Sequence, residues 1–238
     1  MRKLALLLPF VVVSFAANSL ITRFVVARGL LDAGLLGATR FAAGAAVLVA
    51  VALGRGERTL VRRAHLLPAL WLGIYTVCIC YGYLFIGAAA GTVVFYCAVL
   101  VTLIGYDRFT GMAVGPRRLV GAAVALAGVA VLVTAVALGP AAVGVAAGLH
   151  VTAAGLAWAA AMGAVPTALA YIAWYACQRS MSATTAGTVQ LVIPILTAAG
   201  AVALLGEPLS VALFVAAALV AAGMWLARPP SPVAPRGG

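Results

Sequence analysis

Residues 155–177 read GLAWAAAMGAVPTALAYIAWYAC, residues 182–210 read SATTAGTVQLVIPILTAAGAVALLGEPLS, and residues 211–227 read VALFVAAALVAAGMWLA. Only two short stretches, Gln178–Ser182 and Gly206–Pro208, interrupt these apolar runs. A bilayer core about 30 Å thick takes roughly 20 apolar residues of helix to cross, and each run is near that length. This part of the chain therefore predicts three membrane-spanning helices.

The same stretch repeats an earlier part of the chain. Ala186–Val189 (AGTV) repeats Ala90–Val93 at an offset of 96 residues, and Tyr171 falls on Tyr75 in the same register. After a slip of one residue a third pair of segments aligns, Ala216–Met224 with Gly121–Val129. A register that is held across three consecutive segments indicates an internal repeat.

Composition gives the class of protein. Of the 238 residues 66% are hydrophobic and only 8% are charged, which is more apolar surface than a soluble domain of this size can bury. The runs are apolar on every face, whereas the strands of a membrane β-barrel alternate between polar and apolar residues. We therefore expect an all-α integral membrane protein.

Eight spans account for the apolar runs. We place them at about residues 4–22, 34–53, 68–87, 90–106, 118–138, 155–177, 185–205 and 209–227. In domain terms, residues 1–138 form a first repeat of five helices, 139–154 a connection, 155–228 a shortened second repeat of three helices, and 229–238 a disordered cytoplasmic tail.

The distribution of basic residues orients these spans. Twelve lie on one side, against only Arg23 and Arg28 on the other, and Arg40 lies within a span; the twelve are Arg2, Lys3, Arg55, Arg58, Arg62, Arg63, Arg108, Arg117, Arg118, Arg179, Arg228 and Arg236. By the positive-inside rule both termini are cytoplasmic, and the net charge of +11 needs no nucleic acid to explain it. With eight spans, helices 3–5 and 6–8 run in opposite directions, which is the inverted-topology repeat typical of secondary transporters.

Several motifs resemble a known transporter family. They are Tyr171–Tyr175 (YIAWY), Ser182–Thr184 (SAT), Val189–Pro194 (VQLVIP), Leu205–Ser210 (LGEPLS), Ala17–Leu20 (ANSL), Thr39–Gly44 (TRFAAG) and Phe85–Leu103. Over nearly the whole chain these motifs are similar to EamA-type members of the drug/metabolite transporter superfamily. The resemblance implies a membrane transporter of small solutes and gives little information on which solute.

One feature departs from that family. Its members usually have ten helices, five plus five, and here the second repeat lacks its first two. Residues 139–154, between the fifth and sixth spans, are too few for two crossings. We therefore expect a shortened, eight-helix member, or the product of a deletion or misannotation, in which transport by a single chain is in question.

Arg40 is the strongest candidate for a binding residue. It lies about seven residues inside its predicted helix, where an unpaired guanidinium costs at least a few kcal/mol. It could anchor the anionic or carboxylate group of a substrate in a water-filled cavity. Alternatively it extends to the outer membrane surface, or bonds helix carbonyls as a structural clamp.

Other polar and aromatic residues are candidates for the same site. Pro194 frees the backbone carbonyl of Gln190 one turn earlier, so both can present polar groups to a cavity or form a tolerated kink. Tyr171 and Trp174 share a helix face, although an aromatic belt at the cytoplasmic end explains such residues as well. Tyr75, which Tyr171 repeats, and Asn18 complete the substrate-binding candidates, and helix-to-helix hydrogen bonding is the alternative for Asn18.

The remaining chemistry is sparse. The four acids Asp32, Glu57, Asp107 and Glu207 fall in loops or at helix ends, so Glu207, at the outer edge, is the candidate for proton coupling. Neither a nucleotide-binding loop, a metal-ligand spacing nor a nucleophile with its base is present, so we expect no cofactor, no metal and no enzyme activity. The expected partners are a small-molecule substrate and membrane lipids, without nucleic acid, and the sequence leaves a homodimer open.

We therefore expect a secondary transporter, acting as an exporter of a small metabolite or drug-like solute. One alternative is a small-multidrug-type efflux protein, although the membrane-embedded glutamate of that group is missing here. The other is a non-transporting paralogue or accessory subunit.

Overall fold

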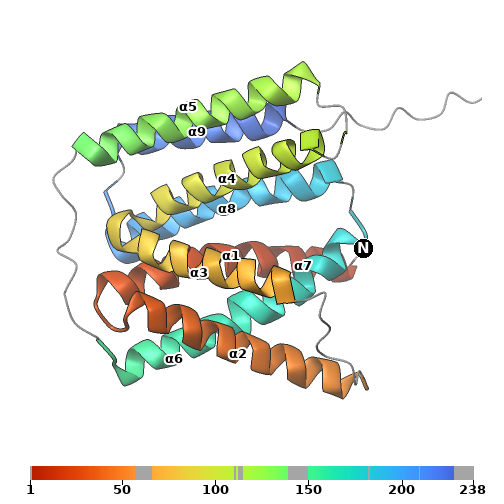
Figure 1. Cartoon of the computed structure of the whole chain (residues 1–238), viewed down its shortest axis with the longest axis vertical. Helices are drawn as coiled ribbons and strands as arrows, with labels where there is room; N and C mark the ends of the chain where they lie inside the picture. The colour runs from red at the N-terminus through yellow and green to blue at the C-terminus, as the bar shows by residue number, and fades with distance from the viewer. Residues whose placement is uncertain are drawn as a thin grey trace, which may run out of the picture.

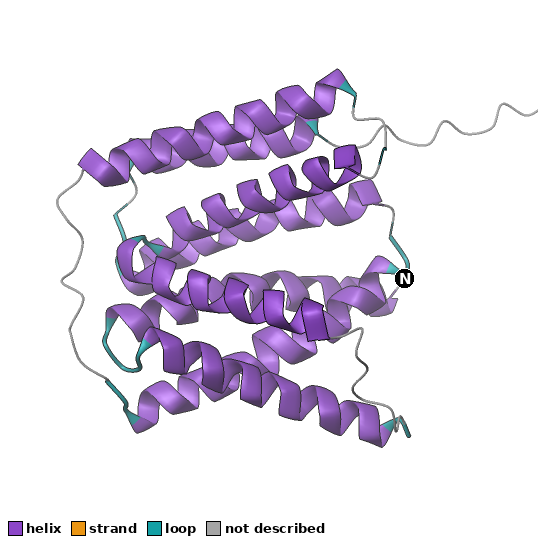
Figure 2. Cartoon of the chain, in the orientation of Figure 1, coloured by secondary structure: helices purple, strands orange, loops and turns teal. Residues whose placement is uncertain are grey.

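The computed structural model describes residues 2–56, 66–109, 111, 115–138, 150–181, 183–208 and 210–227. Within these ranges the chain is helical and has no strand, apart from a single bridge between Leu31 and Val151 (Figure 2). The helices are α1 Arg2–Ala27, α2 Ala33–Gly54, α3 Leu66–Phe85, α4 Ala88–Phe109, α5 Pro116–Leu138, α6 Ala153–Met162, the π-helix η2 Gly163–Leu169, α7 Ala170–Gln178, α8 Ala183–Leu205 and α9 Val211–Leu226.

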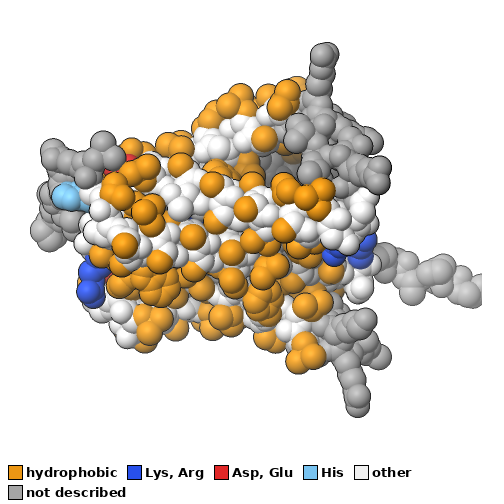
Figure 3. Space-filling view, turned by 90° about the horizontal axis from the view of Figure 1, so that it is seen from below, with side chains coloured by type: hydrophobic (Ala, Val, Ile, Leu, Met, Phe, Trp, Pro, Cys, Tyr) orange, Lys and Arg blue, Asp and Glu red, His pale blue; other side chains and the backbone are white. Residues whose placement is uncertain are grey.

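Each of the eight predicted ranges lies largely within these helices, with α6, η2 and α7 forming one continuous span, Ala153–Gln178. In the described residues five helices are long and apolar enough to cross a membrane, and 119–131, 192–205 and 211–226 are shorter apolar stretches. Hydrophobic side chains are spread over the face seen in Figure 3, and Lys and Arg side chains lie at its two ends. The chain is therefore a multi-pass membrane protein. Most of the predicted connection (139–149) and the predicted tail (229–238) lie outside the described residues.

The π-helix in the sixth span has a local cause. Pro166 lies within Gly163–Leu169 and has no backbone N–H to donate. In an α-helix its ring would also meet the carbonyl of Met162, four residues earlier. The wider turn of a π-helix relieves this clash, and π-helical segments of this kind are frequent at functional sites.

The helices form two layers, which Figure 1 shows in projection. The pair α5 and α9 lies at one edge, α4 and α8 come next, α1, α3 and α7 occupy the middle, and α2 crosses α6 at the other edge. Backbones touch between α5 and α9, because a methyl group on Gly121 or on Gly223 would overlap the backbone oxygen of the other residue. Small residues at such an interface allow the close packing by which membrane helices associate.

One end of the bundle is tied together by short connections. The backbone of Asp32 donates to the carbonyl of His150 (2.8 Å), and Thr152 bonds the carbonyl of Leu30 through both its backbone N–H (3.0 Å) and its hydroxyl (2.6 Å). The Asp32 carboxylate also accepts from the N–H of Gly34 at 2.8 Å and so caps the start of α2. These bonds bring the start of α2 against the start of α6.

Candidate functional site

A cavity of about 190 Å³ lies in the middle of the molecule, between α1, α2, α3, α4, α7 and α8. Its lining is Phe15, Asn18, Ser19, Thr22, Arg40, Tyr75, Ile79, Tyr83, Phe95, Tyr96, Val99, Tyr171, Trp174, Gln190 and Ile193. Six of the seven predicted substrate-binding residues, far apart in the sequence, are therefore together in one place. Nothing in a chain this apolar distinguishes Phe15, Tyr83, Phe95 and Tyr96 from packing residues, so their place in the lining was not predictable.

Arg40 is the one charged residue among the described residues that line this cavity. Its side chain is 4% exposed, so it does not extend along the surface toward the membrane interface. Its Nε atom is buried without a hydrogen-bond partner, and Arg40 forms no ion pair within the described ranges. A buried guanidinium with free donor capacity is suited to bind an anionic group.

The position of Arg40 is set by the close approach of α2 to the π-helix. A Cβ atom at Gly163 would overlap the backbone oxygen of Arg40, and one at Gly44 would lie 3.2 Å from the backbone oxygen of Gly163. Glycine at both positions therefore lets the two helices touch at the part of α2 that carries Arg40. The unusual helix geometry and the buried charge occur at the same contact.

Polar groups of α1 and α8 face the same cavity. The side-chain oxygen of Asn18 is buried and has no hydrogen-bond partner, so it is a free acceptor. The hydroxyl of Thr22 does not satisfy it, because it donates to the backbone carbonyl of Asn18 (2.7 Å). Ser19 and Gln190 line the cavity as well. The site thus offers free donors from Arg40 and a free acceptor from Asn18.

Aromatic rings form two walls of the cavity. In one wall the ring of Phe15 on α1 lies 5.1 Å from that of Tyr171 and 6.1 Å from that of Trp174, centroid to centroid. In the other wall Phe95 on α4 lies 5.7 Å from Tyr75 and 5.1 Å from Tyr96. These rings surround the polar groups with apolar surface and narrow the space for a ligand.

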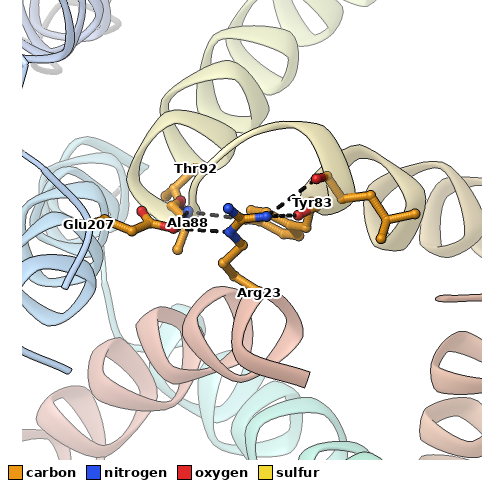
Figure 4. Close-up of polar contacts among 6 residues, drawn as sticks. Arg23, Tyr83, Ala88, Thr92 and Glu207 are labelled. Carbon is orange, nitrogen blue, oxygen red and sulfur yellow. Dashed lines mark hydrogen bonds and ion pairs between the residues drawn. The ribbon is translucent and has the colours of Figure 1, made fainter. Parts of the chain in front are cut away.

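Arg23 and Glu207 form an ion pair (Figure 4), and Tyr83, to whose carbonyl Arg23 donates, belongs to the cavity lining. Arg23 follows Thr22, and its Nε lies 3.1 Å from Oε1 of Glu207 in an ion pair whose side chains are 15% and 18% exposed. Arg23 also donates to the carbonyl of Tyr83 (2.7 Å), while Glu207 accepts from the N–H of Ala88 at 3.0 Å. The cation therefore sits at the C-terminus of α3 and the anion at the N-terminus of α4, where the helix dipoles favour each.

Two predicted residues lie elsewhere. Pro194 lines an apolar groove between α8 and α9 instead of the cavity. Glu207, the candidate for proton coupling, lies in the ion pair with Arg23 and not in the cavity lining. Their roles in transport remain predictions, and the pairing of Glu207 with Arg23, 184 positions earlier, had no signal in the sequence.

Comparison with known proteins agrees with the resemblance drawn from the motifs. Residues 131–228 match the model of the EamA-like transporter family, which confirms the resemblance over this part of the chain. An uncharacterized protein of Pseudomonas aeruginosa is 27% identical to this chain over 254 residues, and the alignment covers 88% of each protein. No solved structure matches the chain significantly.

Proposed function

Since residues 131–228 match the EamA-like transporter family, we propose that this protein is a secondary transporter whose substrate is a small solute with an anionic group. The observation that carries the proposal is Arg40, a buried guanidinium without an ion-pair partner among the described residues, which lines a cavity in the middle of the membrane helices. A carboxylate that enters the cavity gives this charge the partner it lacks.

The energetics favour such a ligand. A charged side chain at the centre of a membrane helix costs at least about 2.5 kcal/mol, and intramembrane charges of this kind line cavities and substrate pathways. Arg binds carboxylates through two parallel hydrogen bonds, which add geometric specificity to the charge. The substrate therefore contributes an interaction that the described residues of the protein do not supply to Arg40.

The other residues of the cavity lining restrict the class of substrate further. A cavity of about 190 Å³ is smaller than the pockets of ~300–1,000 Å³ that hold drug-sized ligands, so the solute is of metabolite size. The free oxygen of Asn18 needs a donor such as an ammonium or hydroxyl group. Around these groups the aromatic walls suit an apolar portion, and amino acids combine all three features.

The transport cycle follows from the two halves of the chain. We infer that both termini are cytoplasmic. We also infer that α3–α5 and the last three spans (α6–η2–α7, α8 and α9) form an inverted repeat that exposes the cavity to each side in turn. The Arg23–Glu207 ion pair joins the first half to the second at the end that this topology places outside. In an exporter this pair separates to release the solute.

The test is transport of labelled amino acids by vesicles that contain the purified protein. Arg40→Lys keeps the charge and loses the planar fork, so affinity should fall by about 10- to 100-fold, which corresponds to ~1.5–3 kcal/mol for a bond to a charged group. The affinity of Arg40→Ala should fall further. Arg55→Ala, at the exposed end of α2, should transport as the wild type does.

Folding is measured on the same preparations by monodispersity in detergent and by melting temperature. A structural clamp would lower folded yield in both Arg40 variants before transport changes. Well-folded Arg40→Ala protein with unchanged transport would refute the anionic-substrate proposal. A wild-type protein that transports no amino acid in either direction would favour the alternative of a non-transporting paralogue or accessory subunit.

A further inference from the structure

A groove of about 290 Å³ runs between α3 and α4 on the outside of the molecule. Cys78, Gly82 and Ile86 line it from α3 and the turn after it, and Gly91, Val94 and Ala98 line it from α4. The thiol-bearing residue Cys78 and also Ala98 are exposed. This α3–α4 groove is apolar and is not filled by any described residue of the chain.

The groove lies directly against the central cavity. Four residues line both spaces, namely Tyr75, Ile79, Tyr83 and Phe95. A wall one side chain thick therefore separates a cavity that contains a buried charge from the surroundings of the protein. Polar groups at membrane depth are tolerated where protein or a water-filled cavity surrounds them, and on this side the four shared side chains are the cover.

The other half of the chain shows what fills the corresponding place. At the offset of 96 residues, Ala173 and Trp174 correspond to Val77 and Cys78. The first two are 7% and 5% exposed because α1 packs on them through Val11 and Phe15. Val77, by contrast, is 47% exposed, and Cys78 is exposed too. The α3–α4 groove is therefore the counterpart, in the first half of the chain, of the surface that α1 covers in the second half. No described helix covers the groove.

The Pseudomonas aeruginosa relative has more residues than this chain within the aligned region. Its alignment is 254 positions long but includes only about 209 residues of this chain (88% of 238), so at about 45 positions the relative has a residue and this chain has none. In total these positions equal the length of two membrane crossings of roughly 20 residues each with a short turn.

We propose that the α3–α4 groove binds a helical hairpin from a separate polypeptide, which completes the outer wall of the central cavity. The proposal builds on the proposed transport function because it completes the same site. Binding of the hairpin is measured without transport, so the two can fail independently.

The probe is the longest run of the Pseudomonas aeruginosa relative that has no counterpart in this chain, made as a tagged fragment and expressed together with the full chain. The fragment should copurify with the wild-type chain. Gly82→Trp fills the groove and should reduce copurification by at least about tenfold, the change that ~1.4 kcal/mol of lost binding produces. Gly73→Trp is the matched control, since Gly73 lies on the same helix outside the groove and, like Gly82, has open space at its Cβ position.

A second measurement locates the contact. In a chain that keeps Cys78 as its single cysteine, oxidation should cross-link Cys78 to cysteines on one face of the fragment, and a cysteine at Leu126 on α5 should not cross-link. Equal copurification with Gly82→Trp and Gly73→Trp would overturn the proposal. Absence of the fragment from wild-type preparations would also overturn it and would mean that lipid occupies the groove. A Cys78–Cys78 dimer would overturn it as well, because a second copy of the chain would then occupy the groove.

Discussion

Replacement of Gly163 by Ala tests whether the contact between α2 and the π-helix positions Arg40. The added methyl group would overlap the backbone oxygen of Arg40, and it would lie 2.9 Å from Cβ of Ala43 and 3.0 Å from the carbonyl carbon of Arg40. Carbon atoms pack at ~3.5–4.0 Å, so α2 must move away by roughly 0.5–1 Å. Overpacking of this kind costs about 1–3 kcal/mol, of which the better helix propensity of Ala offsets up to ~1 kcal/mol.

The expected net loss is about 1–2 kcal/mol in the free energy of unfolding, with a weakening of substrate affinity of about 5- to 30-fold if the shift disturbs Arg40 to a similar extent. Unfolding in mixed micelles and uptake into vesicles measure the two effects. Gly73→Ala is the control, because its methyl group meets no atom within 4 Å and should leave stability unchanged or raise it by up to ~1 kcal/mol. If Gly163→Ala matched this control in both stability and affinity, the close contact would not be what positions Arg40.

Two further predictions concern coupling and topology. Within the described part of the chain no carboxylate lines the cavity, so an uncoupler should leave most of the transport intact. Transport abolished by the uncoupler in both the wild type and Glu207→Gln would refute this. Abolition in the wild type alone would identify Glu207 as the coupling residue. Cysteines placed at Arg55 and Arg117 should resist a membrane-impermeant thiol reagent in intact cells, whereas one at Arg28 should react, and the opposite pattern would reverse the orientation that we infer from the basic residues.

The sequence was sufficient for the helices and for six of the 15 residues that line the cavity. A stretch of 20 apolar residues has few structures open to it in a bilayer, so the spans follow from composition and length. Arg40 and Asn18 were identifiable because a charge or an amide inside such a stretch needs a particular environment. Their gathering with Tyr75, Tyr171 and Gln190 around one cavity is consistent with that reasoning, and their roles in binding stay predictions.

Features that depend on how helices meet were not predictable from the sequence. Arg23 lay near the end of a span, where a basic residue needs no partner, so its contact with Glu207 became visible only when the chain was folded. Pro166 was the available signal for the π-helix, but a proline within a span is also compatible with a simple kink. The α3–α4 groove exists because no residue in the described ranges packs over it, and a sequence does not display which surface stays uncovered.

The contact between α5 and α9 determines which parts of this molecule can move. Where Gly121 faces Gly223 no side chains lie between the two helices, and a turn or slide of either one drives a neighbouring methyl group, such as that of Ala125, into the backbone of the other. The two helices therefore travel as one body although they come from opposite halves of the chain. In the transport cycle that we propose, a rocking motion of the halves would have its axis at this edge, and its amplitude would grow toward the opposite edge, where α2 crosses α6 and presents Arg40.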